Sequence, residues 1–271
     1  MPVADVNSVQ LAYEDEGSGD PLILVHGSWT NRHSWDRVAP RLAERFRVVR
    51  HDRRGHSESS AASGTLEDDA ADIAALADHL ELGPFHLACS SRGGVIGLKL
   101  IAARPELVRS IVCHEPPLLG VLSEDGAEGE LLTRLVAEEG RVVEMIETGD
   151  HEAAARFFVE KVAYGPGAWA RFPRFLRQTY VENAETFAEE YRDPGGYSVD
   201  LEALGRFRGP VLLTSSDNSP EWFGVVIDRL ARRLPRVERH EYRGAGHNPQ
   251  GMAAEEYVRV VGDFVARAAK A

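Results

Sequence analysis

Short, continuous apolar runs that alternate with helical patterns constrain this chain most. The clearest run is LILVHG, residues 22–27, and similar runs recur at 46–52, 85–90, 110–115 and 209–217. A strand that is apolar at almost every position is buried on both faces, as in a parallel sheet covered by helices. The sequence therefore predicts an α/β fold around a mostly parallel central sheet.

Segments with helical spacing separate these runs. They are expected at 34–45, 66–82, 92–103, 221–234 and 254–270. Because short connections join strand and helix in turn, helices are predicted on both faces of the sheet. An alternating strand at 9–17 and a strand at 237–244 complete the pattern.

The alternation breaks after Pro116-Pro117. Residues from about 123 to 197 are helical, acidic and aromatic, with no convincing buried strand, and the strand pattern restarts at 209. The simplest interpretation is a core domain made of residues 1–117 and 201–271. A helical segment, residues 118–200, is then inserted between two strands of that core.

Charge and composition exclude several classes of function. The 43 acidic and 31 basic residues give a net charge of −12, which disfavours a nucleic-acid partner. No apolar run approaches the roughly 20 residues that span a bilayer, so no membrane association is predicted. The N-terminal MPVADVNSVQ lacks a secretion signal, and a cytoplasmic location is expected. Two cysteines are too few for a disulfide framework or a zinc cluster.

The segment HLACSSRGG, residues 86–94, places two serines where a strand meets a helix. A nucleophilic serine at such a junction sits on a sharp, strained turn, so the residues two before and two after it must be small. Ser90 would be flanked by Ala88 and the bulky Arg92, whereas Ser91 is flanked by Cys89 and Gly93. Ser91 is therefore the predicted nucleophile, with capping of the following helix as its alternative role.

A serine hydroxyl needs a base, and the base needs a group that orients it. His247, in the Gly-rich loop RGAGHNPQ before the terminal helix, is the predicted base. Asp217, in LLTSSDN after the preceding apolar strand, is the predicted acid. Asp200 is the rival, although its position suggests that it precedes a strand and caps a short helix.

Acyl transfer also needs donors aimed at the developing oxyanion. The backbone N–H of Arg92, directly after the nucleophile, is one expected donor. The other is the N–H of Ser28, which follows LILVHG, with Trp29 next in line.

Five segments together resemble the α/β-hydrolase superfamily over essentially the whole chain: LVHGSW (24–29), DRRGHSES (52–59), HLACSSRGG (86–94), LLTSSDN (212–218) and GAGHNPQ (244–250). The resemblance implies the α/β-hydrolase fold, the same Ser91, Asp217 and His247, and a helical cap over the site. Two positions depart from the family pattern: Cys89 stands for the first glycine around the nucleophile, and Ser57 stands for a second glycine.

The serine nucleophile favours attack on a carbonyl, so the predicted activity is hydrolysis of an ester or lactone through an acyl-enzyme, with no metal and no organic cofactor. Carbon–carbon cleavage of a β-diketone, acyl transfer and perhydrolysis use the same residues and stay open. Ligand binding without hydrolysis on this fold also stays open.

Aromatic residues in the helical insertion predict an apolar pocket for a medium-sized hydrophobic or aromatic substrate. Trp29 and Arg92 are the predicted substrate-binding side chains. The Arg92 cation could meet a substrate carboxylate or phenolate, or it could pair with an acid of the insertion. Apolar surface on the insertion could also support a homodimer.

Overall fold

The apolar runs lie side by side in one sheet. In the computed structural model, which describes residues 2–61 and 63–270, the sheet has eight strands in the order β1-β2-β4-β3-β5-β6-β7-β8. The strands are β1 (Val3–Val6), β2 (Val9–Gly17), β3 (Pro21–Val25), β4 (Arg47–His51), β5 (Phe85–Ser90), β6 (Val108–His114), β7 (Val211–Ser216) and β8 (Val237–Tyr242). Pairing is antiparallel for β1 with β2 and β2 with β4, and parallel between all other neighbours.

The register brings the carboxyl ends of the central strands to one edge. Val25 pairs with Cys89, Cys89 with Cys113, and His114 with Thr214. Every residue of β5 is buried, as a strand covered on both faces requires. The loops that follow β3, β5, β6, β7 and β8 therefore emerge beside one another, which is where open α/β sheets place their sites.

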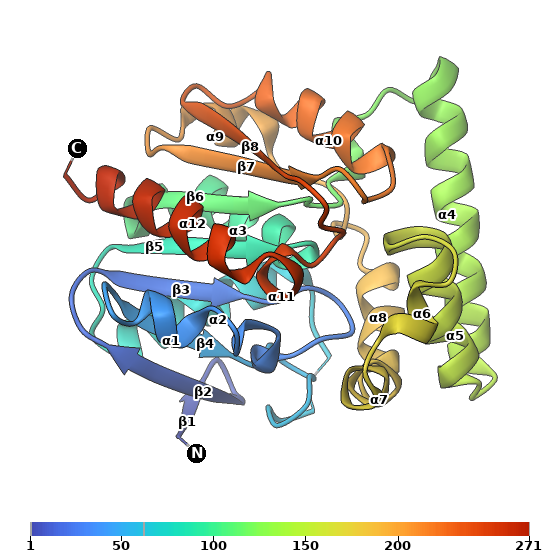
Figure 1. Ribbon diagram of the computed structural model, residues 1–271, viewed down its shortest axis with the longest axis horizontal. Helices are drawn as coiled ribbons and strands as arrows, with labels where there is room; N and C mark the ends of the chain where they lie inside the picture. Colours follow the sequence, from blue (N-terminus) through green and yellow to red (C-terminus); the bar gives the residue numbers. More distant parts are fainter. Residues whose placement is uncertain (1, 62, 271) are drawn as a thin grey trace.

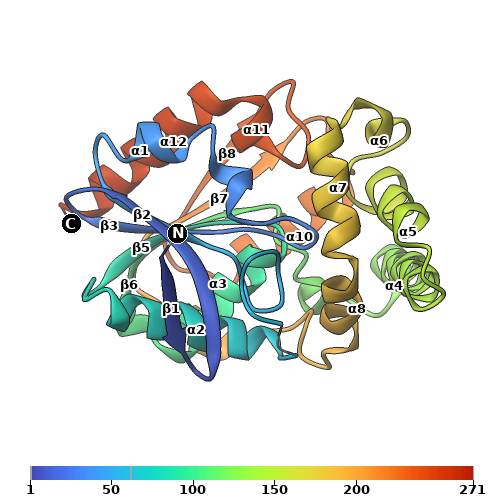
Figure 2. The same ribbon diagram turned by 90° about the horizontal axis from the view of Figure 1, so that it is seen from below.

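Helices cover both faces of the sheet (Figure 2). The helices are α1 (Ala39–Leu42), α2 (Leu66–His79), α3 (Arg92–Ala103), α4 (Gly126–Glu147), α5 (His151–Phe157), α6 (Ala168–Arg171), α7 (Arg174–Glu182), α8 (Ala184–Arg192), α9 (Leu201–Arg206), α10 (Trp222–Ala231), α11 (Pro249–Met252) and α12 (Ala254–Ala268). One apolar core includes residues of α2, α3 and α10, and the other includes residues of α1 and α12. This confirms the predicted α/β architecture.

Residues 118–200, called the cap below, contain α4 to α8. These helices lie beyond the carboxyl ends of the central strands, away from both layers that cover the sheet (Figure 1). A short π-helix, η4 (Phe158–Ala163), continues α5. The cap packs on the core through Trp29, whose ring stacks on Phe187 at 4.9 Å and on Tyr180 at 6.0 Å.

Local structure differs from the sequence predictions at a few places. The helix expected at 34–45 is instead a 3₁₀ turn, η1 (Arg32–Trp35), followed by the single turn α1, since Pro40 has no N–H to donate and restricts the residue before it. The four-residue strand β1 was not predicted. Residues 1 and 271, the outer bounds of the predicted core domain, lie outside the described residues. No helix within residues 2–61 and 63–270 is both long enough and apolar enough to span a bilayer.

Candidate active site

Ser91 occupies the sharp turn between β5 and α3. Its backbone has φ 53° and ψ −125°, a conformation that a residue with a side chain rarely adopts. Its N–H donates to the carbonyl of His114 at 2.8 Å, which holds the turn against β6. Ser90, by contrast, is the last residue of β5. The structure therefore places Ser91, and not Ser90, at the strained position that a nucleophilic serine requires.

Glycines make room for this turn. A Cβ on Gly93 would lie 2.4 Å from the carbonyl oxygen of Val25 and 2.5 Å from that of His26, so only glycine fits against the end of β3. A Cβ on Gly97 would lie 2.8 Å from Cys89 Sγ. The absence of a side chain at Gly97 thus accommodates the cysteine that replaces the family glycine.

His247 lies between β8 and α11 and is 6% exposed. Its ring stacks on Phe223 at 4.2 Å and meets Tyr164 edge-on at 5.6 Å. Its Nδ1 is 2.6 Å from Oε2 of Glu115. Burial lowers the pKa of His247 below 6.5, and the hydrogen bond with Glu115 opposes this shift.

The prediction that Asp217 is the acid paired with His247 is wrong. Asp217 is exposed, and its Oδ1 accepts the Gly244 N–H at 2.7 Å. The rival Asp200 caps α9 by accepting the N–H of Ala203 at 2.9 Å. The carboxylate that reaches the histidine comes instead from Glu115, directly after β6.

The Glu115 carboxylate is fully buried and held by the end of β7 and the loop that follows it. Its Oε1 accepts the N–H of Ser216 at 2.7 Å, and its Oε2 accepts the Ser219 hydroxyl at 2.8 Å. Burial would raise the pKa of Glu115, but His114 and His247 together with these hydrogen bonds hold it well below its usual value. A carboxylate that stays ionised in this place can orient the His247 ring and stabilise its protonated form.

Glu115 was not among the predicted acids, because the partner of His247 was expected at Asp217, after β7, with Asp200 as the rival. Its signal is the sequence SIVCHEPP, in which an acidic residue ends a continuous apolar strand. Glu115 also has a positive φ of 43°, and Trp29 in the loop after β3 has φ 67°. With Ser91, these residues form a group of strained positions at one edge of the sheet, a grouping typical of functional sites.

Ser28 and Arg92, the two predicted oxyanion donors, lie close to Ser91. Ser28 lies in the turn after β3, and a Cβ on the adjacent Gly27 would be 2.9 Å from the Ser91 Cβ, so the two loops touch. Arg92 is the first residue of α3, where a backbone N–H has no acceptor within the helix. Both predicted donors thus flank Ser91.

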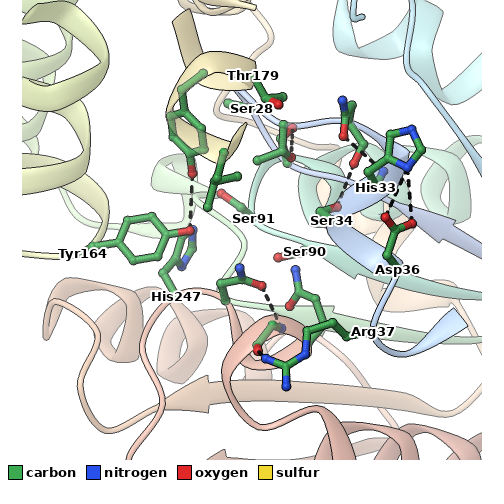
Figure 3. Close-up of a pocket in the computed structure, with 18 of the residues that line it drawn as sticks. Ser28, His33, Ser34, Asp36, Arg37, Ser90, Ser91, Tyr164, Thr179 and His247 are labelled. Carbon is green, nitrogen blue, oxygen red and sulfur yellow. Dashed lines mark hydrogen bonds and ion pairs between the residues drawn. The ribbon is translucent and has the colours of Figure 1, made fainter. Parts of the chain in front are cut away.

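A cavity of about 190 Å³ connects these residues, and Ser28, Ser91 and His247 all line it (Figure 3). The cap contributes mainly apolar and aromatic walls, including Phe158, Tyr164 and Leu176. The core contributes polar walls: Thr30, Asn31, His33, Ser34, Asp36, Arg37, Asn248 and Gln250. The cavity is therefore amphipathic, and Ser91 and His247 line it together with both kinds of wall.

Comparison with known proteins identifies the family. The sequence model described as "Alpha/beta hydrolase family" matches residues 22–260. The chain belongs to the alpha/beta hydrolase family. The uncharacterized hydrolase YraK of Bacillus subtilis (strain 168) is 36% identical over 121 residues, which are 43% of this chain and 45% of that protein. The chain spans less than half the length of this and the other curated relatives that it matches.

Solved structures share the fold of this hydrolase. The enol-lactonase of Burkholderia xenovorans LB400 is 20% identical, with a TM-score of 0.81 over 98% of this chain and 100% of that one. The meta-cleavage product hydrolase of Pseudomonas fluorescens IP01 is 20% identical, with a TM-score of 0.75 over 99% and 98% of the two chains. At these identities the likeness shows the fold alone.

The two predicted substrate-binding side chains of this hydrolase, those of Arg92 and Trp29, are both buried. Arg92 is 1% exposed, and its guanidinium lies 4.4 Å from the centre of the Tyr197 ring and donates to the Gly196 carbonyl at 2.9 Å. Trp29 is fully buried among cap aromatics. Among the described residues, neither side chain lines the 190 Å³ cavity, although Arg92 lines a smaller cavity of about 10 Å³ together with Ser28, Ser91 and His247. This geometry therefore gives no support to substrate contact by Trp29, and substrate contact by Arg92 stays a prediction. The Arg92 cation meets the cap, the second of the two outcomes expected for it.

One group of buried side chains is close enough together to hold a small cation. Ligand atoms of His114, Glu115 and His247 lie within 4.8 Å of one another, and all three residues are buried. A cation bound there would compete with the hydrogen bond between Glu115 and His247. We therefore interpret this geometry as a hydrogen bond by which Glu115 orients His247, rather than as a metal site.

Proposed function

We propose that this alpha/beta hydrolase cleaves the carboxylic ester bond of a medium-sized hydrophobic or aromatic ester or lactone. The observation that carries the proposal is the 2.6 Å contact between Glu115 and His247, together with the cavity that His247 shares with Ser91. Nucleophile, base and orienting acid are then Ser91, His247 and Glu115, a set that differs from the predicted one only in the acid.

In the first half-reaction, the Ser91 hydroxyl oxygen attacks the substrate carbonyl carbon as the Nε2 of His247 accepts its proton. Glu115, at Nδ1, fixes the orientation of the ring and stabilises its positive charge. The N–H groups of Ser28 and Arg92 would stabilise the negative charge on the carbonyl oxygen. Collapse of the tetrahedral intermediate breaks the bond to the leaving oxygen, which takes the proton from His247, and leaves an acyl group on Ser91.

In the second half-reaction, water attacks the acyl carbonyl and loses a proton to His247. The bond to Ser91 then breaks, and the serine oxygen recovers the proton. With a lactone the leaving oxygen belongs to the same molecule, so the single product is a hydroxy acid. No step requires a group from outside the chain other than water.

The cavity supports an amphipathic substrate. Its cap side, with Phe158, Tyr164 and Tyr180, suits an acyl chain or an aryl ring, and its core side offers hydrogen-bonding groups such as Asn31 and Thr30. Its volume of about 190 Å³ favours small to medium ligands over long lipids. The substrate is thus proposed to be a small-molecule ester or lactone with one apolar end and one polar end.

A substrate panel tests the bond that is cleaved. Purified enzyme and its Ser91→Ala variant are incubated with aryl and alkyl esters, with five- and six-membered lactones and with a β-diketone, and the products are identified by mass spectrometry. Turnover of esters or lactones by the wild type, absent from Ser91→Ala, supports the proposal.

Two other outcomes would replace it. Cleavage of the diketone with no turnover of esters would assign carbon–carbon hydrolysis, in keeping with the structural likeness to the meta-cleavage product hydrolase of Pseudomonas fluorescens IP01. Tight binding of these compounds without turnover would assign a ligand-binding role.

A further inference from the structure

Glu190 of the cap is a buried carboxylate surrounded by groups of the core. It lies on α8 and is 5% exposed. Its Oε1 is 2.8 Å from Arg53 Nη1 and 3.8 Å from His56 Nε2. Its Oε2 accepts the Ser28 hydroxyl at 2.5 Å and lies 3.5 Å from Arg92 Nε.

Oε2 thus contacts Ser28 through a hydrogen bond and Arg92 through an ion pair without a hydrogen bond. These are the two residues whose backbone N–H groups are proposed to form the oxyanion hole. Ser28 follows β3, and Arg92 begins α3, so they come from separate loops of the core. One carboxylate oxygen from the cap therefore ties both loops together through their side chains.

On the core side of this contact, Arg53 has two further partners. Arg53 Nη2 is 2.8 Å from Oδ2 of Asp69 on α2. The Arg53 N–H donates to Nε2 of His26 at 3.0 Å, and Nδ1 of His26 is 2.8 Å from the carbonyl oxygen of Gly27. Glu190 thus joins a network that reaches the Gly27–Ser28 turn by two routes.

We propose that Glu190 is a positioning residue through which the docked cap completes the oxyanion hole. It fixes Ser28 and Arg92 so that their N–H groups point at the reacting carbonyl oxygen, and a displaced cap would release both. This inference rests on the proposed function. It predicts that loss of the contact slows the chemical step more than it weakens substrate binding, because the hole acts on charge that develops in the transition state.

Electrostatics keeps the contact closed. Burial raises the pKa of Glu190, but Arg53, Arg92, His56 and the Ser28 hydroxyl together lower it below its usual value. Movement of the cap away from the core would leave the buried cations of Arg53 and Arg92 without this partner. Such unpairing of buried charges is costly, so the docked cap is the favoured state.

The first test compares three variants. Glu190→Gln removes the charge with little change in shape, and Ser28→Ala removes the hydroxyl but keeps the backbone N–H. Asp69→Asn is the matched control, because it removes a buried carboxylate from the same Arg53 without touching Ser28 or Arg92. Circular dichroism and thermal unfolding establish that each variant is folded.

We expect Glu190→Gln and Ser28→Ala to lower kcat about 10- to 100-fold, less than the effect of deleting an oxyanion donor outright, with KM changed by less than about threefold. Affinity for a trifluoromethyl ketone, whose adduct with serine carries an oxyanion, should fall by a similar factor. The kcat of Asp69→Asn should stay at least about tenfold above that of Glu190→Gln. Equal losses of kcat in Glu190→Gln and Asp69→Asn would overturn the proposal, because they would indicate a structural role only.

A second measurement does not depend on any activity. Deuterium uptake of peptides that cover residues 27–30 and 92–94 reports the mobility of both loops directly. Faster uptake in Glu190→Gln, with wild-type uptake in Asp69→Asn, supports the inference even if no ester is hydrolysed. Unchanged uptake in folded Glu190→Gln would overturn it, whereas an enzyme that turns over no ester or lactone would overturn only the proposed function.

Discussion

Glu115 and His247 are 132 positions apart in the chain, yet Oε2 of the carboxylate lies 2.6 Å from Nδ1 of the imidazole. The loop after β7 was predicted to supply the acid; instead, Ser216 at the end of β7 and Ser219 in that loop donate hydrogen bonds to Glu115. The acid of the proposed catalytic site thus follows β6, and the neighbouring loop holds it in place.

Substitution of the acid separates Glu115 from Asp217. We expect Glu115→Gln to lower kcat by about 10³- to 10⁴-fold, because the amide no longer stabilises the protonated His247. Asp217→Asn, the matched control, should stay within about threefold of wild type, as expected for an exposed residue away from the site. Initial rates on the best substrate check both. A large loss in Asp217→Asn with little loss in Glu115→Gln would contradict the assignment.

The pH dependence follows from the environment of His247. Burial lowers its pKa below 6.5, and the base must be neutral to accept the proton from Ser91. The acidic limb of a plot of kcat/KM against pH should therefore have its midpoint below 6.5. Because the hydrogen bond with Glu115 raises the pKa, the residual activity of Glu115→Gln should have its midpoint lower still. A wild-type midpoint above 6.5 would show that His247 is not the titrating base.

The turn at Ser91 depends on Gly93. An alanine there would place its Cβ within 2.5 Å of two carbonyl oxygens of β3 and its loop, so Gly93→Ala should cost about 1–3 kcal/mol of unfolding free energy and most of the activity. Gly224 is also helical, and its Cβ would meet nothing within 4 Å. Gly224→Ala should therefore stabilise the protein by about 0.4–1 kcal/mol. Urea unfolding measures both, and equal effects would contradict the packing argument.

Buried histidines predict how stability varies with pH. Burial lowers the pKa of His56 from 6.5 to about 4. Between pH 4 and pH 6.5 the unfolded chain binds a proton at His56 that the folded chain does not. The contribution of neutral, buried His56 to the free energy of unfolding is therefore complete above pH 6.5 and is lost as the pH falls toward 4. His56→Gln should reduce the slope of unfolding free energy against pH by about 1.4 kcal/mol per unit in this range. Parallel slopes for wild type and variant, from urea unfolding at several pH values, would contradict this.

Much of the fold could be predicted because the buried strands have a clear apolar pattern. LILVHG and FHLACS are almost entirely apolar, and they became β3 and β5 within one or two residues of their predicted bounds. The turn at Ser91 was also accessible to sequence reasoning, because steric demands on Cys89 and Gly93 distinguish it from Ser90. One exception was the segment around Pro40, where helical spacing was present but proline prevented one continuous helix from passing through it.

The acidic partner of His247 could not be identified from the sequence in the same way. Asp217 and Glu115 both follow strands that end at the same edge of the sheet, and Asp217 follows the strand next to β8. Which of them reaches His247 depends on the path of two loops and on one extra methylene in the glutamate. The fate of the Arg92 side chain depended equally on the cap, because Tyr197, Gly196 and Glu190 are about a hundred residues away in sequence.

The most direct test of the account is covalent labelling of the nucleophile. Folded protein is treated with a fluorophosphonate, and its intact mass is measured beside those of Ser91→Ala and of Ser90→Ala, a neighbouring serine that also lines the cavity. We expect one adduct on the wild type and on Ser90→Ala, and none on Ser91→Ala. An adduct that persists in Ser91→Ala, or a folded wild type that takes none, would contradict the central claim that Ser91 is an activated nucleophile.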